Sequence, residues 1–418
     1  MKIAVIGGGS AYAPGLLQAF AADAAAFEGA ELALMDVAEA ELAIVHRLGL
    51  RLLEGTGLRL TATVQRQRAI DGATHVLTTF REGGLEARHL DEAIPLQAGV
   101  IGQETIGPGG FFFARRTLPV IRAVTDEMAR WAPDATLVNY TNPTQIVAEA
   151  VRRYTDVRCV AICDQTDDDR VHIAAALDVS PRDIELESVG VNHATWSRRC
   201  RIEGEDGVAR MIAENDRVQA RDDVSSRTKR QFELTARFGQ VPNSYLQYYY
   251  YPERTVAEAK AASRTRAQAI ADELPGHYRH FAEQAAADVP HLTRGRGGSV
   301  FGDFAVRVLR TLATGEHARL TLNVPNAGQA VPDFDENRIV EVPCTVEGGR
   351  ITPEPQNRLA DDRRGLLRRL ADYQACAARS IWEGDDDAQI RALASNPLVG
   401  SLDRAEALTT LRAAAAER

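Results

Sequence analysis

Short apolar segments recur along the first 165 residues and alternate with stretches of helical composition. These segments are residues 3–6, 32–35, 76–80, 136–139 and 159–162. A strand that is buried on both faces is apolar throughout, and parallel neighbours are joined by a crossover of about a dozen residues or more, usually a helix. The spacing therefore predicts an α/β domain over residues 1–165, with a parallel sheet covered by helices on both faces.

The pattern changes after Asp164, where strand and helix signals no longer alternate regularly. We expect strands over residues 184–190, 319–324 and 339–346, and helices over residues 209–237, 257–287, 305–312 and from 359 onward. Neither an internal repeat nor a composition typical of a linker separates the two regions. We therefore expect a mixed α+β second domain over residues 166–418, packed against the first without an extended hinge.

The composition excludes several classes of protein. With 45% hydrophobic and 26% charged residues, the chain has the balance of a globular enzyme, and it lacks an uncharged apolar run that could cross a membrane. A formal charge of −9 argues against nucleic-acid binding, which requires clustered Lys and Arg. The five scattered cysteines predict reduced thiols, and the first residues lack the features of a secretion signal. We expect a cytoplasmic protein.

A glycine turn, Gly7-Gly8-Gly9-Ser10, directly follows the first apolar segment. Backbone amides in such a turn, at the start of a helix, can hold a pyrophosphate. The usual GxGxxG pattern is only loosely met, because Tyr12 stands at the third position and Gly15 lies three residues beyond. Asp36 ends the second segment, where a carboxylate binds ribose hydroxyls, which favours NAD over NADP. The alternative is a glycine turn in another α/β protein, with Asp36 merely a strand-end residue.

A candidate metal pair follows the fifth segment. Cys163 stands at its carboxyl end, and His193 comes after a later strand-like stretch. Open α/β sheets bind ligands at this edge, and imidazole and thiolate are both donors for divalent ions. Cys163 alone would be interpreted as a small buried hydrophobe, as is Cys159. The presence of His193 favours the interpretation of Cys163 as a metal ligand. Two protein ligands would leave positions open for substrate oxygens.

The chain resembles glycoside hydrolase family 4, the NAD-dependent and metal-dependent glycosidases, over nearly its whole length. The matching segments are residues 7–10, 81–85, 91–92, 94–96, 102–105, 107–110, 141–143, 163–164, 190–193, 242–251 and 296–298. The resemblance implies NAD, Mn²⁺ on Cys163 and His193, a dinucleotide domain similar to that of lactate and malate dehydrogenases, and a homodimer or homotetramer. It also implies that Tyr245 abstracts a proton.

The resemblance also implies the chemistry. Hydride removal from sugar C3 makes a ketone, Tyr245 takes the acidified C2 proton, and elimination expels the aglycone with Asp164 as the candidate acid. Water then adds and the hydride returns from NADH, so that no carboxylate pair is needed. Members acting on 6-phospho-α-glucosides have Asp after the metal cysteine, so Asp164 indicates that subgroup. The sequence departs from the family pattern at Gln165-Thr166-Asp167, where a Met-Pro or Val-Pro pair is usual.

Four further residues are candidates for substrate binding. Asn142 ends the fourth segment and is placed to hydrogen-bond a sugar hydroxyl near the nicotinamide; the alternative is a simple Asn-Pro turn. Arg81, Arg88 and Arg296 are candidates for a clamp on a 6-phosphate, although arginine is ordinarily a surface residue. The substrate is thus expected to be a phosphorylated sugar.

Other functions stay open at this point. Within the family, the alternatives are a 6-phospho-β-glucosidase and an unphosphorylated α-glycosidase. Outside it, an NAD-dependent sugar or hydroxyacid dehydrogenase would use the same fold, and a sensor would hold NAD without catalysis. The presence of Cys163, His193 and Tyr245 together argues against the sensor.

Overall fold

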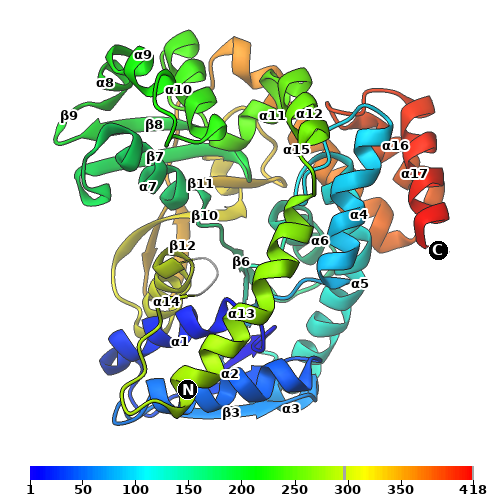
Figure 1. Cartoon of the computed structure of the whole chain (residues 1–418). Coiled ribbons are helices and arrows are strands. Elements are labelled where there is room, and N and C mark those ends of the chain that lie inside the picture. The colour runs from blue at the N-terminus through cyan, green and yellow to red at the C-terminus, as the bar shows by residue number, and fades with distance from the viewer. Residues whose placement is uncertain (295–297, 417–418) are drawn as a thin grey trace.

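The computed structural model describes residues 1–294 and 298–416 (Figure 1). Within these ranges twelve strands form one sheet of order β3-β2-β1-β4-β5-β6-β10-β11-β7-β8-β9, with β12 paired to β11. The strands are β1 (Lys2–Ile6), β2 (Glu31–Met35), β3 (Arg59–Thr63), β4 (His75–Thr78), β5 (Thr136–Asn139), β6 (Arg158–Ala161), β7 (Ile184–Val191), β8 (Ala194–Ile202), β9 (Glu205–Asp206), β10 (Ala318–Pro325), β11 (Ile339–Glu347) and β12 (Arg350–Pro353).

The first six strands in this order are parallel, and the others pair antiparallel. The parallel half has the strand order of doubly wound dinucleotide-binding domains, so the predicted α/β class is confirmed. The two halves meet where β10 pairs with β6. The sheet therefore continues past residue 165, and the division into domains at that residue stays a prediction.

Helices cover the sheet and extend the second half. They are α1 (Ala13–Ala22), α2 (Glu39–Leu52), α3 (Arg66–Ile70), α4 (Gly84–Gln97), α5 (Gly107–Trp131), α6 (Thr144–Tyr154), α7 (Gln165–Leu177), α8 (Gly207–Ala213), α9 (Asn215–Gln219), α10 (Ser226–Phe238), α11 (Gln247–Tyr250), α12 (Pro252–Ala261), α13 (Arg266–Ala286), α14 (Gly298–Thr314), α15 (Asp361–Glu383), α16 (Asp386–Ser395) and α17 (Leu402–Ala416). In the described chain, no helix combines the length and the apolar character needed to cross a bilayer.

Two predicted helices are shorter than expected because capping residues interrupt them. Residues 209–237 form α8, α9 and α10, and Ser225 starts α10 by accepting a hydrogen bond from the Thr228 amide at 3.2 Å. Residues 257–287 are divided between α12 and α13, and Thr265 with Gln268 forms a capping box at the start of α13. These polar residues satisfy backbone groups at helix ends, so each starts a new helix.

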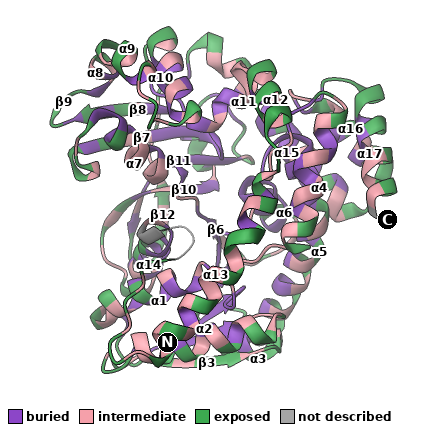
Figure 2. Cartoon of the chain, viewed as in Figure 1, coloured by how far each residue is buried: buried purple, intermediate pink, exposed green. Residues whose placement is uncertain are grey.

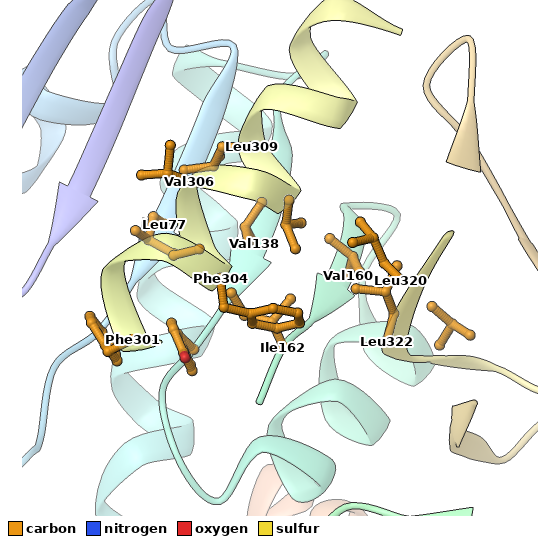
Figure 3. Packing of buried hydrophobic residues seen from close by; sticks show 14 of the residues in the cluster. Leu77, Val138, Val160, Ile162, Phe301, Phe304, Val306, Leu309, Leu320 and Leu322 are labelled. Atoms are coloured by element: carbon orange, nitrogen blue, oxygen red, sulfur yellow. The ribbon is translucent and has the colours of Figure 1, made fainter. Parts of the chain in front are cut away.

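The core lies on both faces of the sheet, as the apolar strands predict. Along β1, Ile3 and Val5 pack into one cluster, while Ala4 and Ile6 pack into the other. Figure 3 shows α14 lying over the first face, with its apolar side chains against Leu77 and Val138. Along α5, buried positions alternate with exposed ones after residue 114, whereas α6 is buried from residue 144 to 151 and exposed only near its end (Figure 2). Both faces are therefore protected, which leaves the strand ends as the accessible edge.

Candidate active site

A cavity of about 1200 Å³ lies at the carboxyl edge of the parallel strands. It extends from the glycine turn after β1, past the ends of β2, β4 and β5, to the segment that carries Tyr245. Helix α13 lines one wall and packs against α2 and α4 (Figure 1). The cavity is thus at the edge where open α/β sheets bind ligands.

The glycine turn forms one end of this cavity. Gly7 has φ +100°, and a Cβ there would lie 2.7 Å from the Thr79 backbone, so only glycine fits. Gly7, Gly9 and Ser10 line the cavity, whereas Gly8 donates its amide to the Met35 carbonyl at 2.9 Å. The buried Ser10 hydroxyl has no hydrogen-bond partner among the described residues. A tight turn with an unpaired hydroxyl at a helix start fits a bound pyrophosphate.

Asp36 lies beside this turn, as predicted, and lines the cavity. Its Oδ2 accepts a hydrogen bond from the Gly9 amide at 2.9 Å, and its Oδ1 accepts one from the Ala38 amide at 3.1 Å. Each carboxylate oxygen has a second lone pair for a ribose hydroxyl. The residues present therefore fit NAD.

Cys163 and His193 come together although they are 30 residues apart. The distance from Cys163 Sγ to His193 Nε2 is 3.5 Å, and Thr105 Oγ1 lies 3.1 Å from His193 Nδ1. Thr105 thus orients the ring so that Nε2 points toward the thiol. His193 has φ +61° in the turn between β7 and β8, an uncommon conformation that turns its ring toward β6.

The protonation states of this pair fit a metal that binds two protein ligands. Burial lowers the pKa of His193 to about 4, so the imidazole is neutral and can coordinate. Burial raises the pKa of Cys163 well above its usual value, and a bound dication would release its proton. Within the described chain, no group of three or more His, Cys, Asp or Glu side chains is placed to hold a metal ion. Further coordination positions would then be left to water or substrate.

Asp164 follows Cys163 and is the N-cap residue that directly precedes α7. It lines the cavity, and burial raises the pKa of its carboxyl to about 6. A carboxyl with this pKa holds its proton for part of the time near neutral pH. It can therefore act as a general acid.

Tyr245 stacks on the imidazole of His193, with ring centroids 4.3 Å apart. Asn243 Oδ1 accepts a hydrogen bond from the Tyr245 amide at 3.0 Å, which fixes the short 3₁₀ turn Ser244–Leu246. Burial raises the pKa of the phenol well above 10, and the positive charge of Arg227 opposes that rise. The phenol therefore needs nearby positive charge before it can act as a base.

Asn142 also faces the cavity, just before a cis peptide bond to Pro143. Its Oδ1 accepts hydrogen bonds from the amide and the hydroxyl of Thr144, at 3.3 and 3.2 Å. The side-chain NH₂ group is thereby left to donate to a ligand, as expected for a group that binds a sugar hydroxyl.

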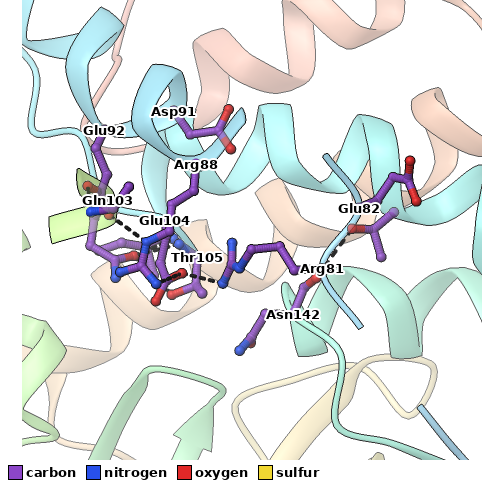
Figure 4. Close-up of polar contacts among 12 residues, drawn as sticks. Arg81, Glu82, Arg88, Asp91, Glu92, Gln103, Glu104, Thr105 and Asn142 are labelled. Atoms are coloured by element: carbon purple, nitrogen blue, oxygen red, sulfur yellow. Dashed lines mark hydrogen bonds and ion pairs between the residues drawn. The ribbon is translucent and has the colours of Figure 1, made fainter. Parts of the chain in front are cut away.

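Two of the three arginines predicted to bind phosphate, Arg81 and Arg88, form ion pairs with Glu104 (Figure 4). Arg88 forms ion pairs of 2.7 Å with both Glu104 and Glu92, and Arg81 pairs with Glu104 while its guanidinium lies 4.3 Å from the centroid of the Phe113 ring. Arg81 and Arg88 do line the cavity, but their charges are already compensated. Arg296 lies outside the described residues.

Two family models match the chain in succession. The model described as family 4 glycosyl hydrolase matches residues 2–179, and the model of the family 4 glycosyl hydrolase C-terminal domain matches residues 188–399. The chain belongs to glycoside hydrolase family 4. The resemblance inferred from the sequence is thereby confirmed.

Members of family 4 that act on either anomer are similar to this chain. A probable 6-phospho-β-glucosidase of Bacillus subtilis (strain 168) is 31% identical over 96% of this chain and 93% of its own. A 6-phospho-α-glucosidase of Leptotrichia buccalis is 27% identical over 97% of this chain and 96% of its own. A 6-phospho-β-glucosidase structure from Thermotoga maritima, with manganese, NAD⁺ and glucose-6-phosphate, has TM-score 0.85 and 25% identity over 99% and 98% of the chains.

Sequence reasoning assigned no role to three side chains of this family 4 site. Glu104 pairs with Arg81 and Arg88, Thr105 orients His193, and Arg227 lies close enough to lower the pKa of Tyr245. Glu104 and Thr105 belong to a segment already matched to the family, so position in that segment was an available signal. Arg227 lies on α10, and only the folded chain brings it to the cavity.

Proposed function

We propose that this family 4 enzyme hydrolyses 6-phospho-α-glucosides with NAD and Mn²⁺. The observation that carries the choice of anomer is Asp164, a protonatable carboxyl directly after the candidate metal cysteine. The cofactors are supported by the fit of the glycine turn and Asp36 to a dinucleotide and of Cys163 and His193 to a divalent ion. When bound, NAD would take up and return a hydride at C3, and the ion would polarise the C3 oxygen.

The chain's own residues would supply the proton transfers. Tyr245 would take the C2 proton, aided by the positive charge of Arg227. Asp164 would give its proton to the glycosidic oxygen as the C1–O bond breaks, and would take one from the water that adds. Asn142 would hold a sugar hydroxyl with its NH₂ group.

A further arginine supports recognition of the 6-phosphate. Arg266 begins α13 and lines the cavity, and among the described residues no carboxylate forms an ion pair with it. The Arg266 guanidinium can bind a phosphate without displacing a carboxylate. The guanidinium groups of Arg81 and Arg88, in contrast, are already paired with Glu104. We therefore include Arg266 with Arg81, Arg88 and Arg296 as candidates for the phosphate site.

The test is release of p-nitrophenol from the 6-phosphates of p-nitrophenyl α- and β-glucoside, with NAD and Mn²⁺ each present or omitted. We expect cleavage of the α-anomer only when both are present, and much slower cleavage of the unphosphorylated glucoside. Preference for the β-anomer would assign the function of the Bacillus subtilis relative. No cleavage, with NADH accumulating, would assign a dehydrogenase instead.

The role of Asp164 has its own test. In Asp164→Asn, glycosides with poor leaving groups should lose far more activity than p-nitrophenyl glycosides, because nitrophenolate leaves without a proton. Asp167→Asn, three residues along and paired with Arg170 at 3.1 Å, is the control and should keep the ratio of the wild type. An equal loss for both kinds of leaving group would remove Asp164 from the role of acid.

A further inference from the structure

A buried polar connection joins the segment that carries Asp164 to the segment that carries Tyr245. Asp169 Oδ2 accepts a hydrogen bond from the Ser244 amide at 3.0 Å. Gln165 Nε2 donates to Asp169 Oδ1 at 2.8 Å and to Ser244 Oγ at 3.3 Å. Asp169 and Ser244 are each 2% exposed and Gln165 is 7% exposed, so these contacts are shielded from water.

The connection ends at the sequence neighbours of both reacting groups. Gln165 is the residue after Asp164 and the first of α7, while Ser244 is the residue before Tyr245. The opposite side of the Tyr245 turn is held separately, because the Asn243 amide donates to the Thr195 carbonyl at 2.8 Å. The turn is thus fixed between β8 and α7, and the phenol lies on His193.

Stability alone does not explain a carboxylate at this place. Asp169 has no ion-pair partner within the described chain, and burial raises its pKa to about 6. Burying a carboxyl costs free energy, and a well-packed apolar side chain would fill the same volume at lower cost. A carboxyl differs from an apolar side chain in making directional hydrogen bonds. The two oxygens of Asp169 hold the Ser244 amide and the Gln165 side chain at fixed angles.

We propose that Gln165 and Asp169 are positioning residues that hold Tyr245 against the C2 proton of the substrate. The inference rests on the proposed role of Tyr245. Gln165 stands where this sequence departs from the Met-Pro or Val-Pro pattern, so the connection through its amide belongs to this chain. Neither side chain needs to touch the reacting atoms, because Asp169 acts through the backbone amide of Ser244 and Gln165 through the Ser244 hydroxyl and Asp169.

The test measures kinetic isotope effects with p-nitrophenyl glucoside 6-phosphate deuterated at C2 or at C3, using the anomer that the wild type cleaves. The variants are Asp169→Asn and the milder Gln165→Met. Misplacing the phenol slows only the C2 step, so we expect kcat to fall about 10- to 100-fold with KM nearly unchanged. The isotope effect from C2 should rise, while that from C3 should not.

Glu149→Gln is the matched control, since Glu149 is another buried carboxyl that accepts a backbone amide, 2.8 Å from the Ile339 nitrogen. Its isotope effects should equal those of the wild type. Affinity for NAD, measured by quenching of protein fluorescence, should be retained in all three variants, which shows that they are folded. An unchanged C2 effect in both Asp169→Asn and Gln165→Met would overturn the inference. A wild type that cleaves no glycoside would overturn the proposed function itself.

Discussion

Glu149 provides a prediction about stability and pH. It lies on α6, is 6% exposed, and joins the two halves of the sheet through its hydrogen bond from the Ile339 amide of β11. Burial raises the pKa of its carboxyl from 4.5 to about 7. In the unfolded chain the same group titrates at its ordinary value.

The folded protein therefore holds a proton that the unfolded chain releases between pH 4.5 and about 7. The contribution of this proton to the free energy of unfolding is fully present below pH 4.5. It is lost as pH rises through about 7, where the charged carboxylate must be buried. Each pH unit across that window is worth about 1.4 kcal/mol, so the lost free energy of unfolding is about 3 kcal/mol.

Glu149→Gln removes the titrating carboxyl and keeps an oxygen that can accept the hydrogen bond from the Ile339 amide. The free energy of unfolding of the variant, relative to the wild type, should rise by about 3 kcal/mol between pH 4.5 and 8. Guanidinium unfolding followed by circular dichroism at several pH values measures this difference. Other buried acids affect both proteins alike and cancel. Glu347→Gln, at an exposed position ending β11, is the control. If Glu149→Gln keeps the pH dependence of the wild type, the reasoning is wrong.

Three further predictions concern the cofactor, the metal and the packing. Asp36→Ala should weaken NAD binding about 10-fold or more in calorimetry, because the ribose hydroxyls lose their acceptor; equal affinity would exclude that role. A chelator should abolish glycosidase activity and Mn²⁺ should restore it, whereas Cys163→Ala should stay inactive at the same Mn²⁺ concentration. Gly302→Val should lower stability by about 1–3 kcal/mol in thermal unfolding, because its Cβ would lie 2.4 Å from the Gly15 carbonyl oxygen; an unchanged midpoint would contradict the packing of α14 on α1.

The central strands could be predicted from the sequence because they are buried on both faces. Strand β1, for example, is buried at its last four positions, which form the apolar run Ile3 to Ile6 that hydropathy detects. Strand β3 was missed because it lies at the edge of the sheet, and its side chains are half-buried or exposed. Strand β8 was missed as well, since arginines interrupt its apolar run. An edge strand is specified by its neighbour more than by its own composition.

The candidate site could be predicted only in part. Cys163 follows a recognisable strand, so its place at the sheet edge follows from the fold class. His193 depends on a left-handed turn between β7 and β8, and only the pairing of β10 and β11 between β6 and β7 brings it to Cys163. Glu104 was not assigned because a charged residue in a loop carries no sign of its partners. Interactions between distant segments are set by tertiary structure, and local pattern does not encode them.

The single-pair junctions of the sheet have a consequence for how the chain folds. Strand β6 meets β10 through Ala161 and Asn323, and β7 meets β11 through Gly190 and Glu341. Segments about 150 residues apart must therefore find each other before the sheet is complete, and such distant pairing slows folding. Until then β6 is an open edge, available to any other strand, including one from a second nascent copy. Aggregation during synthesis is thus the characteristic hazard of a sheet that is completed only when segments far apart in the chain pair.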